Sequence, residues 1–352
     1  MMTRSINKMS LSTKRLVVLL IFSISTLLLF ISSIFIGSSG MSFIDGLKAL
    51  FGEGDRINVI IVQNIRLPRI FAAVIAGVAL SISGVIMQTV SNNVMASPST
   101  LGVSNAAVLG ANIAIIVLGG GTIFSSGGFI DINNPYIVSL FAFGFAFLSI
   151  LLVLGLGRIR RFNNATTVLI GVTFGTFCTG LTTLIQYFAS DNVLSAAVYW
   201  SFGDLGRANY IEDLIMLVVT VIALIFFLVF SYRYNAMLLG EDSASTLGIN
   251  LNVFRFISLL LASLLTAVVV SLVGIIGFIG LIVPQVMRKL VGNDHLPLIV
   301  GSSLMGASVL LFSDIIARVA LNGLALPVGA VTSVIGAPAF ILILLLGRRK
   351  SE

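Results

Sequence analysis

Apolar residues occur along this chain in long unbroken runs that are separated by short polar segments. Asp, Glu, Lys and Arg are absent from four intervals, 70–130, 162–190, 256–287 and 319–347. A helix needs about 20 apolar residues to cross the hydrocarbon core of a bilayer. The pattern therefore predicts membrane-embedded helices, alone or as hairpins.

Ten such runs can be placed on the sequence. The first, from Leu16 to Ile36, is about twice as long as the core of a secretory signal, so we interpret it as a retained span. The other nine fall near 69–90, 101–119, 137–157, 166–189, 211–232, 253–273, 276–292, 298–318 and 328–347. We therefore expect an all-α, polytopic membrane protein with about ten transmembrane helices. Residues 1–352 are expected to form a single transmembrane domain with a tail at 1–15.

The composition supports this class and excludes a soluble globular protein. Hydrophobic residues make up 58% of the 352 positions and charged residues 9%, with a mean hydropathy of +1.13. Soluble domains carry roughly 25% charged residues. The net charge of +7 matters here through the loops that carry it, and we expect no nucleic-acid partner.

The distribution of Lys and Arg predicts the orientation in the membrane. With both termini placed inside, the inner segments carry fourteen of these residues and the outer segments carry six. Cytoplasmic loops are the ones enriched in Lys and Arg. The bias favours cytoplasmic termini and an even number of spans.

Small residues recur at helical spacing in several spans. Ala73, Gly77 and Ser81 share one helix face, as do Gly171 and Gly175. Small faces let membrane helices pack closely. The run of glycines at 274, 277 and 280, followed by Pro284, predicts a span that is closely approached and then bent.

The polar residues of the spans offer little chemistry for an enzyme. Two Gly-x-Ser triplets, at 102–104 and 306–308, have no histidine in any span to activate the serine. The single histidine, His295, is expected to be a solvated loop residue, and the single cysteine, Cys178, a buried packing residue. The sequence contains no GxxxxGK[ST] phosphate loop. We expect no catalytic residue, cofactor or metal site. If transport through these helices is driven by a nucleotide, its hydrolysis would belong to another polypeptide.

Asp314 is the one charged residue deep in a predicted span. Arg318 follows one turn later on the same face, a spacing that favours an ion pair. A coupling-ion site would be the alternative role for an intramembrane carboxylate, as in a secondary transporter.

Two arginines at the start of the second span need an explanation. Arg66 and Arg69 share a helix face at a helix N-terminus, where cations oppose the macrodipole, and they also oppose the positive-inside bias. Snorkelling to lipid headgroups is one interpretation. The other is docking of an acidic partner outside the membrane, which would offset the unfavourable placement.

Two inner segments also stand out. Residues 240–250 read as a short helix with acids in the first turn and a small apolar face, suited either to a groove on a partner or to a simple connection. The turn at 92–98 lacks the Lys or Arg expected inside, so it is a candidate for lining a pore mouth.

Eight stretches of the sequence, taken together and in order, resemble the FecCD-type permeases of the ABC importers for iron-siderophores, haem and cobalamin. The resemblance runs from about residue 60 to the C-terminus. Its motifs are RLPR at 66–69, Gly84 with Gln88, LGVS at 101–104, Trp200 with Gly203, GEDSASTLGIN at 240–250, GFIGLIVPQVMRKLVG at 277–292, SDIIAR at 313–318 and LPVGAVTSVIGAPAF at 326–340.

The resemblance implies a type II ABC importer permease fold and a set of partners. These are a second permease subunit, identical or paralogous, a pair of cytoplasmic ABC ATPases, an extracytoplasmic substrate-binding protein and membrane lipid. It implies docking of the binding protein by Arg66, Arg69 and Arg318. It implies ATPase coupling by Gly240, Glu241, Asp242, Ala244, Leu247 and Gly248, and a cytoplasmic gate at Asn93, Met95, Asn163 and Asn164.

The chain departs from the family pattern at three positions. Gln285 stands where histidine is usual, Ala325 where glutamate is frequent and Val94 where proline is common. None of these removes an arginine of the docking set. The resemblance makes an iron-siderophore the expected cargo, with haem and cobalamin as alternatives.

Overall fold

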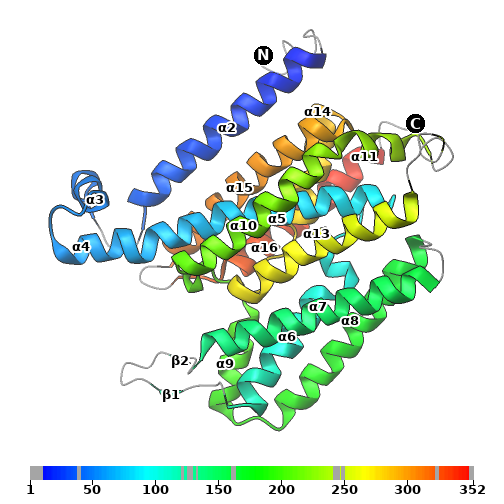
Figure 1. Ribbon diagram of the computed structural model, residues 1–352. Coiled ribbons are helices and arrows are strands. Elements are labelled where there is room, and N and C mark those ends of the chain that lie inside the picture. Colours follow the sequence, from blue (N-terminus) through cyan, green and yellow to red (C-terminus); the bar gives the residue numbers. More distant parts are fainter. Residues whose placement is uncertain are drawn as a thin grey trace.

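The computed structural model describes residues 11–37, 41–119, 123–124, 130–131, 134–159, 164–240, 246, 250–321 and 325–348. Within them the chain is almost wholly helical (Figure 1). The helices are α2 (Leu11–Phe35), α3 (Phe43–Leu50), α4 (Arg56–Ile60), α5 (Leu67–Val90), α6 (Val103–Asn112), α7 (Pro135–Ile159), α8 (Asn164–Tyr187), α9 (Asp191–Ser201), α10 (Tyr210–Val229), α11 (Ser231–Leu238), α13 (Leu251–Val273), α14 (Ile279–Val291), α15 (His295–Val319) and α16 (Val328–Arg348).

Every predicted run corresponds to a helix in the described chain. Seven helices are long and apolar enough to cross a membrane, and α6, extended by a π-helical turn to Val117, and α16 are shorter apolar helices. The remaining predicted run, 276–292, corresponds to α14, which has only 13 residues, or about 20 Å of rise. The all-α polytopic fold expected from the sequence is thus confirmed. The sequence did not predict α3, α9 or α11, or the two-residue hairpin β1 (Ile123–Phe124) and β2 (Ile130–Asp131).

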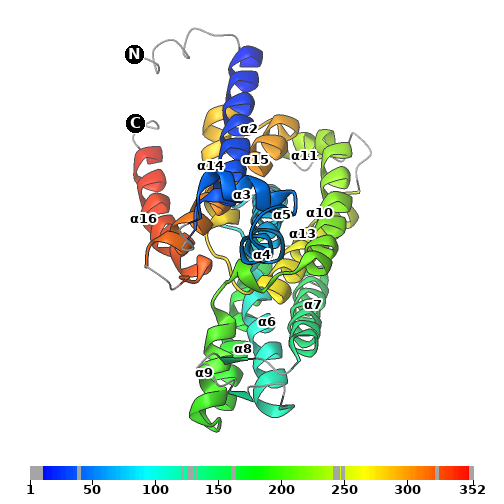
Figure 2. The same cartoon turned by 90° about the vertical axis from the view of Figure 1, so that its left-hand side faces the viewer.

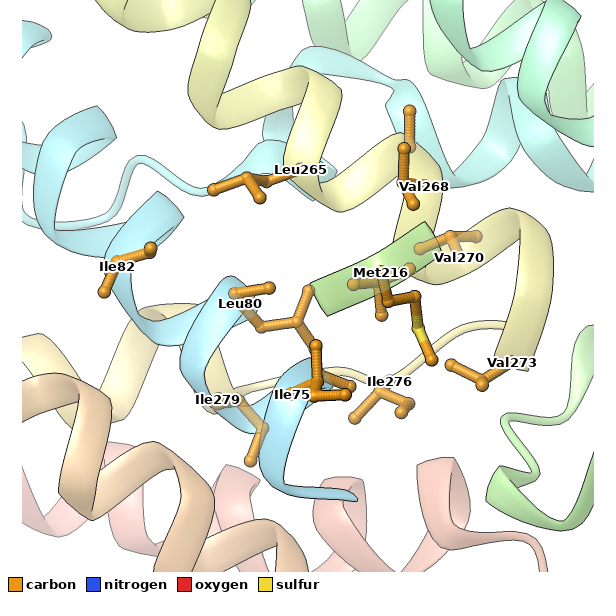
Figure 3. Close-up of a cluster of buried hydrophobic side chains, with 14 of the residues drawn as sticks. Ile75, Leu80, Ile82, Met216, Leu265, Val268, Val270, Val273, Ile276 and Ile279 are labelled. Carbon is orange, nitrogen blue, oxygen red and sulfur yellow. The ribbon is translucent and has the colours of Figure 1, made fainter. Parts of the chain in front are cut away.

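The helix α5 is the centre of the molecule. It contacts α15, α13, α14 and α10, while α6 to α9 form a second group on one side (Figures 1 and 2). A buried apolar cluster fills the space between α5, α10, α13 and the start of α14 (Figure 3). Ile75, Leu80, Met216 and Leu265 lie in it, each at most 7% exposed.

Backbone contacts through glycine explain how the helices approach α5 so closely. A Cβ atom on Gly77 would meet the backbone of Gly306 in α15, and one on Gly84 would overlap the carbonyl of Gly280 in α14. The small face predicted around Gly77 therefore packs as expected. Any larger residue at either crossing would force the helices apart.

The predicted span at 276–292 is helical only from Ile279. Gly274 and Phe278 both have positive φ values, of 80° and 67°, and break the helix between them. The carbonyl of Ile275 lies against Gly203 and Gly329, so this irregular stretch is covered by protein. Non-helical backbone is tolerated at membrane depth only when it is covered in this way or lines a cavity.

Candidate functional site

One end of the α2, α5 and α15 group carries a buried set of charges, which we call the arginine cluster: Arg66, Arg69, Asp204, Asp314 and Arg318. Asp314 is fully buried and binds two arginines, with Oδ1 2.6 Å from Nε of Arg69 and Oδ2 3.0 Å from Nε of Arg318. Nη1 of Arg69 also lies 3.6 Å from Oδ1 of Asp204. The carboxylate of Asp314 thus ties α5 to the last turn of α15, and the predicted pair with Arg318 is confirmed.

Two arginines of the cluster cap the C-terminal end of α2. Arg66 donates from Nη1 to the carbonyl oxygens of Ile34 (2.6 Å) and Phe35 (3.2 Å). Arg318 donates to the carbonyl of Ser33 (3.0 Å) and to its hydroxyl. Carbonyl groups at the end of a helix lack intrahelical partners and carry partial negative charge, so cations are favourable there.

These contacts show that the chain itself offsets part of the unfavourable placement of the arginines. For Arg69, Asp314 and Asp204 of the same chain supply the opposite charge, and for Arg66 the end of α2 supplies acceptors. Arg66 and Arg69 are only 5% and 7% exposed, so neither extends toward headgroups as snorkelling requires. Sequence spacing gave no signal for Asp204, which is remote from Arg69 along the chain.

The loop that supplies Asp204 is anchored by the Trp200 motif. Arg207 donates to the carbonyl oxygens of Trp200 (2.8 Å) and Tyr199 (2.7 Å), and its guanidinium lies 5.7 Å from the centre of the Trp200 ring. Burial lowers the pKa of Arg207, and the nearby carboxylate of Asp204 opposes this shift. These contacts hold the loop against the end of α9, and the pair Arg69–Asp204 attaches it to the start of α5.

At the other end of α5, the turn Asn92–Met95 follows the helix directly. Asn92 adopts a positive φ of 43°, and the side chain of Asn93 accepts a hydrogen bond from the backbone N–H of Met95 (2.9 Å). The side chains of Val94 and Met95 are each 51% exposed. Gln285 of α14 donates to the carbonyl of Val94 (2.9 Å), so two of the three departures from the family pattern contact each other.

Most of the expected coupling residues lie outside the described part of the chain. Gly240 is exposed just beyond the end of α11. Glu241, Asp242, Ala244, Leu247 and Gly248 lie outside the described residues, as does Asn163 of the expected gate. The backbone of Asn164 begins α8. The structure therefore shows Asn93 and Met95 in contact within one turn, and the coupling and gate roles of both sets stay predictions.

His295 is not the solvated loop residue that the sequence predicted. It is the first residue of α15, is 1% exposed, and contacts Thr89 of α5 and Asn235 of α11. The predicted span began at residue 298 because the polar residues before it resemble a loop. Asp294 at the N-cap position with Pro297 in the first turn was the available signal for an earlier helix start.

Comparisons with known proteins agree with this fold. The sequence model of the FecCD transport family matches residues 25–346. Over 342 residues the chain is 44% identical to a Methanocaldococcus jannaschii protein described as an ABC transporter permease, covering 96% of this chain and 97% of that protein. It is 37% identical over 288 residues to a vitamin B12 import system permease protein of Escherichia coli, covering 82% and 84%.

Two solved structures have the same fold. One, described as an inward-facing conformation of a metal-chelate type ABC transporter, is 26% identical, with a TM-score of 0.79 over 93% of this chain and 98% of that chain. PsaBC from Streptococcus pneumoniae, solved in complex with a Fab, is 16% identical, with a TM-score of 0.56 over 82% and 93%. The second likeness concerns the fold alone.

Proposed function

The chain belongs to the FecCD transport family of ABC importer permeases, and we propose that its cargo is a chelated iron compound, an iron-siderophore, carried across the cytoplasmic membrane of a prokaryote. Membership in this family replaces the alternative of an ion-coupled secondary transporter. Both oxygens of Asp314 also face arginines, so this carboxylate has the contacts of an ion pair rather than those of a coupling-ion site.

The observation that carries the proposal is the absence of Asp, Glu, Lys and Arg from the middle of three long helices, α5, α8 and α13. α8 contains no Asp, Glu, Lys or Arg, and α5 and α13 contain none after Arg69 and Arg255, which lie in their first turns. A path without charges suits a large ligand whose metal is already enclosed. A free cation would need carboxylate or carbonyl ligands along the way.

Cobalamin is the second candidate, because relatives at 37% identity are vitamin B12 permeases. The test is uptake by liposomes that contain the assembled transporter with its binding protein, using iron-siderophore, haem and cobalamin in parallel. Saturable, ATP-dependent uptake of the iron-siderophore is expected. Uptake of cobalamin alone would replace the iron proposal while leaving the permease function intact.

An acidic binding protein is the proposed partner at the arginine cluster. The cluster holds three arginines and two carboxylates, which leaves one positive charge in excess. The resulting surplus of positive charge supports docking of a carboxylate from that partner. Arg66 lies nearest the end of α2 and is the residue best placed to test this without breaking the Asp314 pairs.

The docking test replaces Arg66→Gln and measures affinity for the cognate binding protein. Removing a charged hydrogen bond is expected to weaken binding by roughly tenfold. Arg56→Gln is the matched control, since Arg56 is an exposed arginine at the start of α4. Equal affinity of the two variants would contradict docking at Arg66.

The ABC ATPase is the proposed partner at 240–250, and the gate proposed at Asn93 and Met95 would respond to it. Replacing Ala244→Arg is expected to abolish co-purification with the ATPase, because a charged side chain would disrupt a small apolar contact face. Ser190→Arg, in the exposed turn between α8 and α9, is the control. Undisturbed co-purification of the Ala244 variant would remove the coupling assignment.

Both termini are proposed to lie in the cytoplasm. Arg15 near the start of α2 pairs with Asp294 (3.0 Å), and Lys289 of α14 donates to the carbonyl of Ile343 in α16 (3.1 Å). These contacts support the view that the start of α2 and the end of α16 lie on the same side of the membrane. The Lys and Arg bias assigns that end to the inside. Proteolysis of a C-terminal tag in sealed, right-side-out vesicles tests the assignment, and cleavage there would reverse it.

A further inference from the structure

A buried polar network lies at the end of the molecule opposite to the arginine cluster. We call it the His295 network, and it consists of Arg15, Thr89, Asn235, Arg288, Asp294 and His295. Its members come from α2, α5, α11, α14 and α15. None of these residues belongs to the docking, coupling or gate sets.

The hydrogen bonds of Asn235 fix the direction of the network. Its Nδ2 donates to Oδ1 of Asp294 (3.1 Å), so its Oδ1 faces His295. That oxygen accepts from the backbone N–H of His295 (2.9 Å) and lies 2.7 Å from Nδ1 of the ring. Nδ1 therefore carries a proton in this contact, because an amide oxygen cannot donate one. Nε2 is left to bond the hydroxyl of Thr89, 2.8 Å away.

The second half of the network holds the end of α5 against α14. Nη2 of Arg288 donates to the hydroxyl of Thr89 (3.1 Å) and to the carbonyl of Val85 (3.3 Å). One turn earlier on α14, Gln285 holds the carbonyl of Val94. Thr89 and the turn Asn92–Met95 are thus attached to the same face of α14.

The network joins two segments that the proposed function treats separately. Asn235 lies on α11, whose last residue, Leu238, is two positions before the segment 240–250. Thr89 lies on the last turn of α5, three positions before the turn Asn92–Met95. Two side-chain contacts of the His295 ring connect them, one to Asn235 and one to Thr89. The path is buried, since His295 and Thr89 are only 1% and 6% exposed.

We propose that the His295 network transmits displacement of α11 to the turn Asn92–Met95, with His295 and Thr89 as positioning residues. The proposal rests on the coupling and gate assignments of the proposed function. Its physical basis is that separating buried polar partners leaves them unsatisfied, which is unfavourable. Movement of α11 therefore draws α15 and the end of α5 with it. Gln285 then carries the same displacement to the turn itself.

The test measures the response of the turn to ATP. Cys178, the only cysteine, is buried and is replaced by alanine, and Met95→Cys supplies an exposed thiol in the turn. The permease carrying these two changes is assembled with its ATPase in liposomes. The rate of modification by a charged methanethiosulfonate reagent is then compared with and without ATP plus vanadate.

Thr89→Val removes the hydroxyl but keeps the shape of the side chain. It is expected to reduce the ATP-dependent change in modification rate about tenfold, as loss of a buried hydrogen-bonded link implies. Thr220→Val is the matched control, because Thr220 is equally buried and its hydroxyl bonds only Met216 of its own helix among the described residues. This variant should respond as the parent does. Asn235→Ala removes the side chain at the other end of the same path, on α11, where Asn235 is half-buried. This variant serves as the test if the Thr89 variant fails to assemble.

The outcomes separate this inference from the function on which it rests. A parent that responds to ATP, with Thr89→Val and Asn235→Ala variants that respond equally, overturns the role of the network and leaves the coupling and gate assignments standing. A parent that shows no ATP-dependent change overturns the gate assignment, and the inference with it. Loss of response in both network variants, with retained ATPase binding and a normal Thr220→Val control, supports the proposal.

Discussion

The two ends of the α2, α5 and α15 group both hold these three helices together but use different chemistry. The arginine cluster joins α5 and α15 through ion pairs around one fully buried carboxylate, Asp314, and joins both to α2 through arginine hydrogen bonds to its last carbonyl groups. The His295 network joins them through an imidazole, an amide, a hydroxyl and the guanidinium of Arg288, with one ion pair, Arg15–Asp294, at its partly exposed edge. Breaking a buried ion pair leaves an uncompensated charge and costs more than separating neutral partners. The comparison indicates a fixed end at the arginine cluster and an end that can rearrange at the His295 network.

The largest effect is expected from removing the shared carboxylate. Asp314→Ala leaves Arg69 and Arg318 without their buried counter-charge and should destabilise the protein by about 3–5 kcal/mol. The measurement is the midpoint of thermal unfolding in detergent. Ser313→Ala is the control, because this buried neighbour bonds the carbonyl of Val309 within its own helix. Similar midpoints for both variants would remove the contrast between the two ends.

An intermediate effect is expected where α14 crosses α5, closer to the His295 network than to the arginine cluster. Gly84→Ala places a Cβ atom on the carbonyl of Gly280 and should cost about 1–3 kcal/mol, because the helices must separate. Gly144→Ala on α7, where nothing lies within 4 Å, should be neutral or slightly stabilising. Thermal unfolding of both variants checks this. A Gly84 variant as stable as the Gly144 variant would mean that the crossing tolerates a larger separation.

The smallest effect is expected at the edge of the His295 network. Asp294→Asn removes the charge that pairs with Arg15, but the two side chains are 37% and 33% exposed, so solvent screens the pair. The expected cost is about 0.2–1 kcal/mol, decreasing as salt is added. Unfolding midpoints at low and high ionic strength measure it. A loss as large as that of Asp314→Ala would show that both ends depend on charge to the same degree.

The sequence was sufficient for the architecture because lipid imposes a simple rule. Each uncharged run of about 20 residues must satisfy its own backbone hydrogen bonds, so helices follow directly from hydropathy. All ten predicted runs are helical, and the small face around Gly77 packs where its spacing indicated. The pair Asp314–Arg318 was also predictable, since residues four apart on a helix are neighbours.

Only the tertiary structure decided which polar groups meet. Asp204 reaches Arg69, and His295 reaches Thr89 and Asn235, across sequence separations that no periodicity relates. The short α14 likewise depends on Gly203 and Gly329, which cover the irregular stretch before it. The sequence determines which segments enter the membrane, because partition into lipid depends on local composition. Packing between helices decides what their buried charges and hydrogen-bonding groups contact, because that depends on distance in space.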